Sequence, residues 1–226
     1  MGIGPLADLQ AAAQASGLAW RGAFSVSEGD DVPALADGTV ARTLVLLGFA
    51  GRDHWQRFAA SDEACDGAAH PLDRWSRRCI EALACRFGGT GLYPSEGPPW
   101  LPFQRWAMRA EETHTSPLGI LIHPRWGLWH AYRGALAFAT DLAPTPVAVT
   151  GSPCAGCAAK PCLTGCPVDA IAPGRYDWRR CAEHVRSAAG EDCLQLGCRA
   201  RRACPVGAEH RYTAAEAEFH MRAFLR

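Results

Sequence analysis

Eight of the chain's eleven cysteines lie between residues 154 and 204, and this concentration constrains the fold more than any other feature of the sequence. They form two runs of four, which are Cys154, Cys157, Cys162 and Cys166, followed by Cys181, Cys193, Cys198 and Cys204. Each run ends in a Cys-Pro pair, at Pro167 and at Pro205. Thiolates bind soft metal ions and iron–sulfur clusters. The last third of the chain is therefore expected to be a metal-binding module.

Three cysteines followed by a Cys-Pro pair, occurring twice, are typical of a ferredoxin-like domain with two 4Fe–4S clusters. In such domains the cysteine before proline serves the cluster of the other run. We therefore predict one cluster held by Cys154, Cys157, Cys162 and Cys204, and a second held by Cys181, Cys193, Cys198 and Cys166. The first run departs from the usual spacing, because four residues rather than two separate Cys157 from Cys162. The second run is looser still.

These thiols have two alternative uses, zinc binding and disulfide formation. Pairs of the form Cys-x2-Cys also suit tetrahedral zinc, although the Cys-Pro endings favour iron–sulfur clusters. Disulfides are less expected, because the sequence begins without a secretory signal and a reducing, cytoplasmic compartment is the default. The remaining cysteines, Cys65, Cys79 and Cys85, are expected to be small core residues.

Length and composition limit the number of domains and the kinds of partner. A chain of 226 residues has room for one substantial domain and a small one. No run of about eighteen apolar residues occurs, so no membrane partner is expected. The formal net charge of zero gives no support for a nucleic-acid partner. Arg199, Arg201 and Arg202 lie within the second cysteine run, where they either favour a reduced cluster or are simply solvated.

A proline-rich stretch marks the expected domain boundary. Residues 143–146 and 150–153 flank a short apolar segment, which predicts an extended linker or an edge strand. We therefore divide the chain into residues 1–146 and 147–226. Local patterns predict a helix in residues 1–17 with Leu6 and Leu9 on one face, a buried strand over 39–49 and a helix over 71–87. They also predict a hairpin of 118–123 with 128–139, a helix from the cap Asp177 to Gly190 that carries Cys181, and a capping box at Thr213-x2-Glu216.

The stretch LIHPRWGLWHAYRG, residues 121–134, combines aromatic and basic side chains around a tight turn. Aromatic faces and guanidinium groups suit a flat, partly charged ligand. The alternative is that the tryptophans belong to the core and the arginines pair with Asp73 or Glu111. The candidate binding residues are His123, Arg125, Trp126, Trp129 and Arg133.

This stretch, with its pattern IHPRxGxWxAxRG, resembles the cobalamin-binding domain of CblC-type cobalamin-processing proteins, and HPLDRW at residues 70–75 resembles another segment of it more weakly. Together with the cysteine module, the chain looks like epoxyqueuosine reductases and reductive dehalogenases. The resemblance implies an α+β fold, with a nitroreductase-like α/β domain followed by a small ferredoxin-like domain. It also implies that His123 lies near the cobalt face of a corrin, with Arg125 and Arg133 contacting its side chains or supporting the turn.

Three functions remain open. The first is an iron–sulfur protein that reduces a bound cobalamin and removes its upper ligand. The second is a cobalamin-dependent reductase like the epoxyqueuosine reductases, which needs an acid group, with Asp73, Glu111 and Glu112 as candidates. The third is a ferredoxin-type electron carrier whose N-terminal domain binds a flavin, FMN or FAD, or a partner.

Several sequence motifs are absent, and their absence bears on how a cobalamin would be bound and on other enzyme classes. No Asp-x-His-x-x-Gly string occurs, so a bound cobalamin is expected to lack a protein histidine as its lower ligand. Phosphate-binding, zinc-protease and serine-hydrolase motifs are also absent. The expected partners are a small-molecule corrinoid and an external electron donor, which would be a reductase, a flavodoxin or a ferredoxin.

Overall fold

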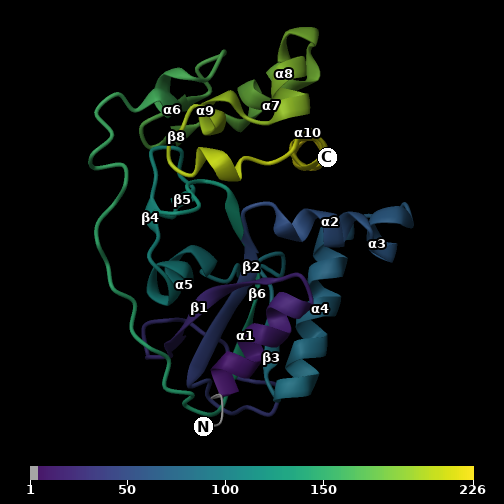
Figure 1. Cartoon of the computed structure of the whole chain (residues 1–226), viewed down its shortest axis with the longest axis vertical. Helices are drawn as coiled ribbons and strands as arrows, with labels where there is room; N and C mark the ends of the chain where they lie inside the picture. Colours follow the sequence, from purple (N-terminus) through teal and green to yellow (C-terminus); the bar gives the residue numbers. More distant parts are fainter. Residues whose placement is uncertain (1–4) are drawn as a thin grey trace. The chain divides into compact units, whose positions relative to one another are not determined.

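The computed structural model describes residues 5–226, which divide into two compact units (Figure 1). The first unit comprises residues 5–112 and 131–149, and the second comprises residues 113–130 and 150–226. The main part of the second unit begins at residue 150, and the predicted domain division at 146/147 stays a prediction. Residues 113–130, here called the crossing segment, group with the cysteine-rich part of the chain. Residues 141–150 form no helix or strand, as expected for an extended linker.

A four-stranded sheet forms the centre of the first unit, in the order β1 (Ala19–Ser25), β2 (Thr43–Ala50), β6 (His130–Phe138) and β3 (Thr90–Leu92). β1 pairs antiparallel with β2, and a bulge lies between Trp20 and Ala23. β3 pairs antiparallel with β6. β2 is buried from Thr43 to Phe49 because its apolar side chains are covered on both faces. The strand predicted over 39–49 is confirmed, although it begins four residues later.

Helices pack around this sheet. They are α1 (Pro5–Ala15), α2 (Asp53–Ala59), α3 (Asp62–Cys65), α4 (Pro71–Phe87) and α5 (Phe103–Ala110). α1 packs against α4 and β1, and α5 packs against β1 and β2. α4 has the predicted bounds, because Pro71 starts it and Gly88, in the left-handed region at φ 72°, ends it. In α1 Leu9 is buried and Leu6 half-buried, while residues 1–4 of the predicted helix lie outside the described part.

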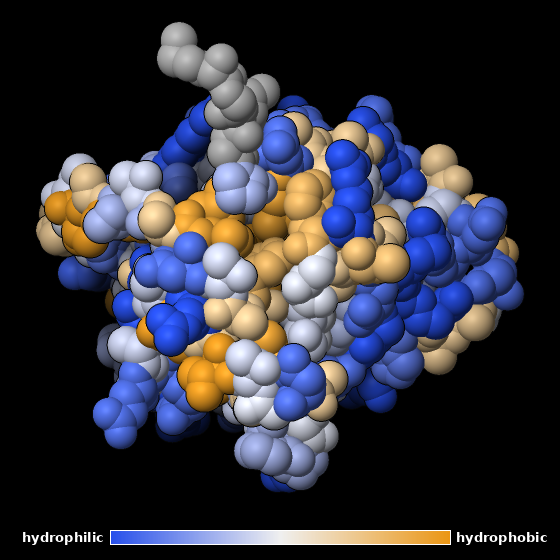
Figure 2. Space-filling view, turned by 90° about the horizontal axis from the view of Figure 1, so that it is seen from below, coloured by the Kyte–Doolittle hydropathy of each residue, from blue (hydrophilic) through white to orange (hydrophobic). Residues whose placement is uncertain are grey.

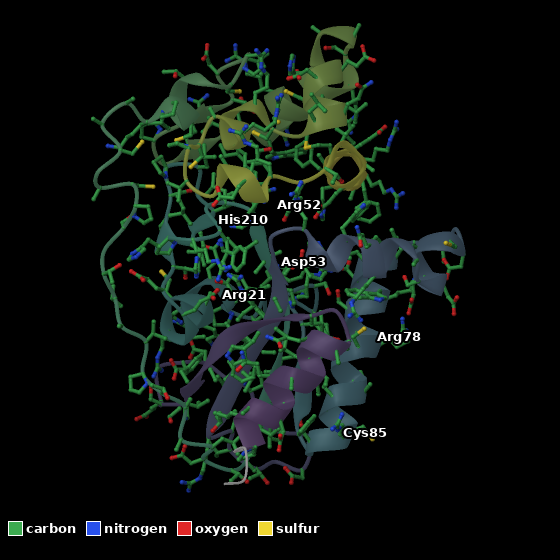
Figure 3. The ribbon with its side chains drawn as sticks, viewed as in Figure 1. Arg21, Arg52, Asp53, Arg78, Cys85 and His210 are labelled. Atoms are coloured by element: carbon green, nitrogen blue, oxygen red, sulfur yellow. The ribbon has the colours of Figure 1, made fainter. Side chains whose placement is uncertain are left out.

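The surface of the first unit carries apolar as well as charged groups. Figure 2 shows hydrophobic atoms gathered in the middle of one face, with hydrophilic atoms around them. Val40 and Trp100 are among the large hydrophobic side chains that stay exposed. Cys85 on α4 is also exposed (Figure 3), as is Cys65, whereas Cys79 is buried. The prediction of three core cysteines is therefore correct only for Cys79, because the other two lie off the buried face of their helices.

The second unit consists of short elements joined by turns. β4 (His114–Thr115) pairs with β5 (Leu121–Ile122), and β7 (Ile171–Ala172) pairs with β8 (Arg175–Tyr176). The helices are α6 (Pro161–Thr164), α7 (Trp178–Arg186), α8 (Glu191–Leu196), α9 (Arg199–Arg202) and α10 (Ala214–Phe224), with single 3₁₀ turns η1 (Ala188–Gly190) and η2 (Ala208–His210). α8 packs against α10, and α6 packs against α9. Elements this short bury little apolar surface, so their arrangement depends mainly on the groups packed inside the unit.

In this unit some local predictions are confirmed and others are wrong. The side chain of Asp177 caps α7 by accepting a hydrogen bond from the Arg180 amide at 3.0 Å, and that of Thr213 caps α10 by accepting one from the Glu216 amide at 3.3 Å. α7 ends at Arg186 rather than Gly190, and a 3₁₀ turn covers the difference. The predicted hairpin of 118–123 with 128–139 is wrong, because β5 pairs with β4 and β6 joins the sheet of the first unit. Only the bridge between His123 and Gly127 remains of it.

Candidate iron–sulfur centres

One group of cysteines surrounds a small cavity in the second unit. Cys166 follows α6, Cys181 lies on α7, Cys193 lies on α8, and Cys198 precedes α9. All four line this cavity together with apolar side chains that include Ile171, Val185 and Met221. The Asp177 cap fixes the start of α7 and hence the position of Cys181 within its first turn. The arrangement brings the second predicted ligand set to one place.

The other group of cysteines lies in an apolar cluster of the same unit. Cys204 is 7% exposed and packs with Ile122 and Leu128, and Cys154 is packed against this cluster. Cys162 is buried on α6, which contacts α9 just before Cys204. Cys157 is linked to Cys154 through a backbone hydrogen bond of 3.4 Å. Cys204 is thus found with the first run, although it ends the second.

The pKa values of these thiols reflect the same two groups. Burial raises the pKa of Cys162, and the nearby charges of Cys204, Cys154 and Cys157 raise it further. Burial likewise raises the pKa of Cys181, to which Cys198 and Cys166 add in the same direction. Thiols that repel one another's ionised form in this way lie close together, and a positively charged metal centre is what would let them ionise together.

The geometry of both groups differs from that of a single-ion site. Within residues 5–226 no three Cys, His, Asp or Glu side chains converge as tightly as one metal ion requires. The sulfurs around a four-iron cluster stand further apart, because the cluster itself lies between them. The donor chemistry fits such clusters, since each group offers four thiols and an apolar surrounding.

The crossing segment packs directly on the Cys204 turn. A Cβ on Gly127, where φ is +57°, would lie 1.9 Å from the carbonyl oxygen of Val206. A Cβ on Gly207 would in turn lie 2.5 Å from the carbonyl carbon of Trp126. The two backbones therefore touch without intervening side chains. Residues from 113–130 are thus part of the wall around the first cysteine group.

Four of the five candidate ligand-binding residues belong to this packed turn. Nδ1 of His123 accepts hydrogen bonds from the amides of Arg125 and Trp126, at 3.0 and 3.2 Å. The guanidinium of Arg125 lies 4.3 Å from the ring centre of Trp126. Trp129 is 3% exposed and therefore a core residue. These contacts give the string IHPRWGLW a local structural role in the second unit.

The fifth candidate, Arg133, belongs to the first unit. Its guanidinium donates to Asp73 and, at 3.1 Å, to the hydroxyl of Ser76. Pairing of an arginine with Asp73 is the alternative to ligand binding that the sequence also allows. The acid candidate Asp73 is therefore half of an ion pair.

A buried polar group surrounds Glu111, the second acid candidate. Arg21 on β1 (Figure 3) donates to Glu111 and, at 3.2 Å, to the carbonyl of Phe49. The hydroxyl of Tyr132 donates to Glu111 at 2.5 Å. Burial raises the pKa of Glu111, while Arg21 and Tyr132 oppose the rise. Glu111 is therefore, like Asp73, half of an ion pair, and burial holds its pKa above the ordinary value.

Arg201 makes more structural contacts in this unit than the sequence predicts. Its Nε donates to the carbonyl of Leu128 at 3.1 Å, and its guanidinium lies 4.4 Å from the ring centre of Trp129 and 4.7 Å from that of Tyr212. It thereby ties α9 to the crossing segment. Arg202 pairs with Asp192, and Arg199 lies 3.6 Å from the same carboxylate. All three arginines therefore have structural partners, which nothing in their spacing indicates.

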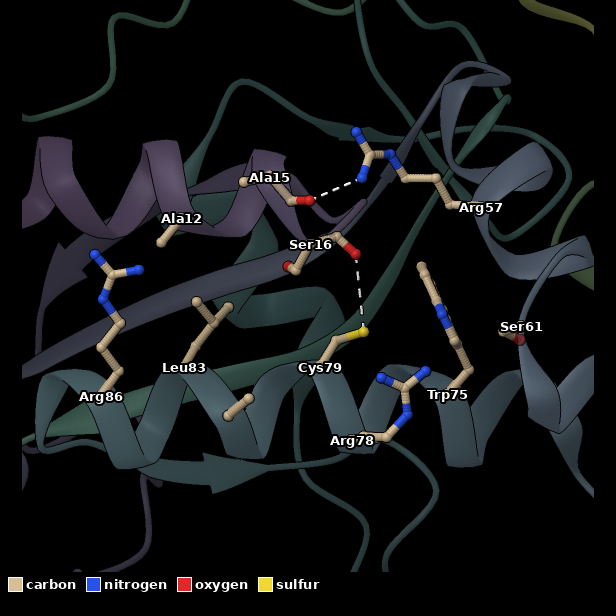
Figure 4. A pocket seen from close by; sticks show the side chains of 11 residues that line it. Ala12, Ala15, Ser16, Arg57, Ser61, Trp75, Arg78, Cys79, Leu83 and Arg86 are labelled. Atoms are coloured by element: carbon tan, nitrogen blue, oxygen red, sulfur yellow. Dashed lines mark hydrogen bonds between the residues drawn. The ribbon is translucent and has the colours of Figure 1, made fainter.

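A separate cavity of about 670 Å³ lies between α1 and α4 in the first unit (Figure 4). Arg57, Arg78, Arg86, Trp75 and Cys79 are among its lining residues. Arg57 donates to the carbonyl of Ala15 at 2.8 Å, and Cys79 donates to that of Ser16 at 3.8 Å. None of the five candidate corrinoid residues lines this cavity or the cavity of the cysteines.

Comparison with known proteins identifies the fold. The structure matches the crystal structure of a selenomethionine-labelled epoxyqueuosine reductase with a TM-score of 0.55 and 13% sequence identity, over 93% of this chain and 68% of that chain. The chain has the fold of epoxyqueuosine reductase. A second match is an epoxyqueuosine reductase solved with an epoxyqueuosine-modified tRNA-Tyr stem loop, with a TM-score of 0.50, 13% identity and 92% and 66% of the two chains covered.

The other comparisons add nothing to this. No protein-family model matches the sequence, and no curated protein matches it. The fold likeness supports the epoxyqueuosine reductase part of the resemblance drawn from the sequence, together with a mixed α+β architecture. It gives no support to a bound flavin. None of the helices in residues 5–226 is long and apolar enough to cross a membrane.

Proposed function

We propose that this chain is an iron–sulfur oxidoreductase that holds two 4Fe–4S clusters and works together with a corrinoid. The observation that carries the proposal is the gathering of eight thiols into two groups of four, each completed by a cysteine of the other run. When bound, the clusters supply low-potential one-electron transfer and a corrinoid supplies a reactive cobalt.

The protein's own residues have definite tasks in this proposal. Cys154, Cys157, Cys162 and Cys204 hold one cluster, while Ile122 and Leu128 keep water away from its ligands. The second cluster is held by Cys166, Cys181, Cys193 and Cys198. Ile171, Val185 and Met221 line the cavity of this second group and would keep water away from its ligands.

The corrinoid part of the proposal rests on the fold and on the resemblance of residues 121–134, and the contacts within each unit do not add to it. His123, Arg125, Trp126 and Trp129 are engaged with their own unit, and Arg133 is paired with Asp73. No catalytic step is therefore assigned to these five residues. A cobalamin reductase that removes the upper ligand and a reductase of an organic substrate both remain compatible with the cysteine geometry.

The fold likeness favours the second of these, reduction of an organic substrate in the manner of epoxyqueuosine reductase. Among the acid candidates, Glu111 is the one whose pKa burial raises, and its carboxylate is held by Arg21 and Tyr132. One enzyme of this fold has been solved with a tRNA stem loop. A modified nucleic acid is therefore a candidate substrate, which is in tension with the expectation from net charge that the chain has no nucleic-acid partner.

Iron and sulfide analysis tests the cluster proposal. Protein purified without oxygen should contain about eight irons and eight sulfides per chain. Cys204→Ala should remove the cluster of Cys154, Cys157 and Cys162, and Cys166→Ala should remove the other, each with a loss of about half of the iron. Paramagnetic resonance of the reduced protein distinguishes which cluster remains. A single zinc ion without sulfide would overturn the proposal. If Cys204→Ala or Cys166→Ala instead removed the cluster bound by the run to which that cysteine belongs, the crossed assignment would be overturned.

Titration with cob(II)alamin tests the corrinoid proposal. Binding should shift the absorption spectrum to that of the form without its dimethylbenzimidazole ligand. His123→Ala should weaken binding, whereas iron content should stay the same. His123→Asn is the matched control for the local turn, because its side-chain oxygen can still accept the amides of residues 125 and 126. If His123→Asn binds as well as the wild type, the imidazole has no part in corrinoid binding. Binding of FMN instead of cobalamin would favour the electron-carrier function.

A further inference from the structure

A second cavity of the cysteine-rich unit has none of the eight proposed ligand cysteines in its lining. It has a volume of about 590 Å³ and lies between the β4–β5 turn, α6 and the β7–β8 turn. We call it the basic pocket. Its lining consists of Thr115, Ser116, Pro117, Leu118, Gly119, Lys160, Leu163, Pro173, Gly174, Arg175 and Tyr176.

The walls of the basic pocket contact both cysteine groups. Leu118 packs against the apolar cluster that contains Cys204 and Cys154. Leu163 follows the buried Cys162 directly in α6. Tyr176, which is 50% exposed, pairs across β7 and β8 with Ile171, which lines the cavity of the other group. A molecule seated in the pocket would therefore lie beside residues that surround both cysteine groups.

The pocket carries positive charge that forms no ion pair with a carboxylate, while the charge of Lys160 also acts on the nearby thiol of Cys154. Lys160 and Arg175 are exposed, and within residues 5–226 neither forms an ion pair. The pocket lining contains no carboxylate. Lys160, the chain's single lysine, also has a positive φ of 37°, a conformation that non-glycine residues adopt mainly where the fold imposes it. The unpaired charges favour an anionic occupant.

The rest of the lining is apolar, with Pro117, Leu118, Leu163 and Pro173 beside the ring of Tyr176. An apolar centre with charged side chains at its edge is the usual composition of a protein–protein contact. A nucleic-acid strand, in contrast, is held by cations spaced along several phosphates, and this pocket offers only two. The lining therefore suits an acidic protein surface better than a nucleic acid.

We propose that the basic pocket is the docking site for an acidic one-electron carrier protein, which delivers electrons to both clusters beside Leu163 and Tyr176. This inference rests on the proposed function, since it requires the clusters to be present. Cys162, Cys193 and Cys204 are buried, so a carrier must approach where the covering layer is thin. Lys160 and Arg175 would attract the carrier's carboxylates and orient it over that layer.

Binding and electron transfer can be measured separately. The first measurement is calorimetric titration of the anaerobic holoprotein with a small acidic ferredoxin in its oxidised, non-reacting state. The second is the rate at which the same ferredoxin, once reduced, reduces the clusters. Lys160→Glu/Arg175→Glu should weaken binding and slow reduction by about tenfold or more at low salt, and raised salt should remove most of the difference. Lys160→Gln and Arg175→Gln should each give a smaller effect.

The control is Arg180→Glu/Arg226→Glu, which makes the same change in net charge on exposed residues outside the pocket. It should bind the ferredoxin nearly as well as the wild type. Equal weakening in both double variants would show that only overall charge matters, and would overturn the docking site. Competition by FMN at constant ionic strength would show that the pocket takes a small anion, and would overturn it as well.

Photoreduction by a deazaflavin separates the docking site from the proposed function. It needs no docked protein, so all variants with full iron content should be photoreduced at the wild-type rate. Wild-type protein without reducible clusters would overturn the proposed function and the docking site with it. If Lys160→Glu/Arg175→Glu has intact, photoreducible clusters and still binds ferredoxin as the wild type does, the docking site alone is overturned.

Discussion

At the scale of single residues, the contact between Gly127 and Val206 shows how strictly the backbone is constrained near the first cysteine group. Gly127 needs both a positive φ and the absence of a side chain, because a Cβ would lie 1.9 Å from a carbonyl oxygen. Val206 follows the Cys204-Pro205 turn by one residue. Any displacement at this contact therefore moves the cysteine that completes the first group.

Gly127→Ala should consequently disrupt the first cluster. We expect a loss of about half of the iron, because the cluster of Cys166, Cys181, Cys193 and Cys198 does not depend on this contact. Gly119→Ala is the matched control, since Gly119 also has a positive φ, of 75°, but a Cβ there meets nothing within 4 Å. The control should cost about 1 kcal/mol of backbone strain and keep its iron. Equal iron loss in both variants would show that strain alone, and not the contact, is responsible.

At the scale of elements, the sequence predicts best those features whose cause is local. α4 keeps its predicted bounds because Pro71, the apolar spacing and Gly88 all lie within the helix or next to it. The caps at Asp177 and Thr213 are equally local. The 118–139 hairpin was mispredicted because its turn is local but its strand pairing is not. β6 instead buries Ala135, Leu136 and Ala137 in the sheet of the first unit.

The same distinction applies to the candidate site. Cysteine spacing predicts which thiols gather. Cys166, Cys181, Cys193 and Cys198 line one cavity and Cys154 packs against the cluster of Cys204, while their use as ligands stays a prediction. Spacing does not indicate that Arg201 holds Leu128 or that Asp192 pairs with Arg202, because these contacts depend on how short helices pack. The composition of the string IHPRWGLW predicts a ligand site, and this stays a prediction. Its contacts with Cys204 and Val206 join residues about eighty positions apart, which no local pattern contains.

The cap of α7 gives a prediction at this scale. Asp177→Ala removes the side-chain acceptor of the Arg180 amide and should cost about 1 kcal/mol of helix stability. Because α7 carries Cys181, a chelator should extract iron from the second cluster about fivefold faster, which corresponds to that free energy. Loss of iron over time is the measurement. Asp177→Asn keeps a capping oxygen and should behave like the wild type; if it loses iron as fast as Asp177→Ala, charge rather than capping is the cause.

At the scale of the whole molecule, the second unit is assembled from two separate parts of the chain. Its cysteines come from residues 150–226, whereas Ile122 and Leu128, which cover Cys204, come from the crossing segment. The linker at 141–149 consists of half-buried or exposed residues without regular structure. The polypeptide can therefore be cut there without removing any part of the cysteine groups' surroundings.

A protease site inserted between Ala148 and Val149 tests this interleaved arrangement. After cleavage, the N-terminal fragment still carries residues 113–130, and their packing around Cys204 and Val206 should keep both fragments together. We expect the fragments to elute as one species with full iron content and to separate only in denaturant. The matched control is the cleaved Ile122→Ala/Leu128→Ala variant, which loses two buried side chains at a cost of about 2–5 kcal/mol each and should fall apart more readily. If the wild-type fragments separate as soon as the linker is cut, the crossing segment does not hold the second unit together.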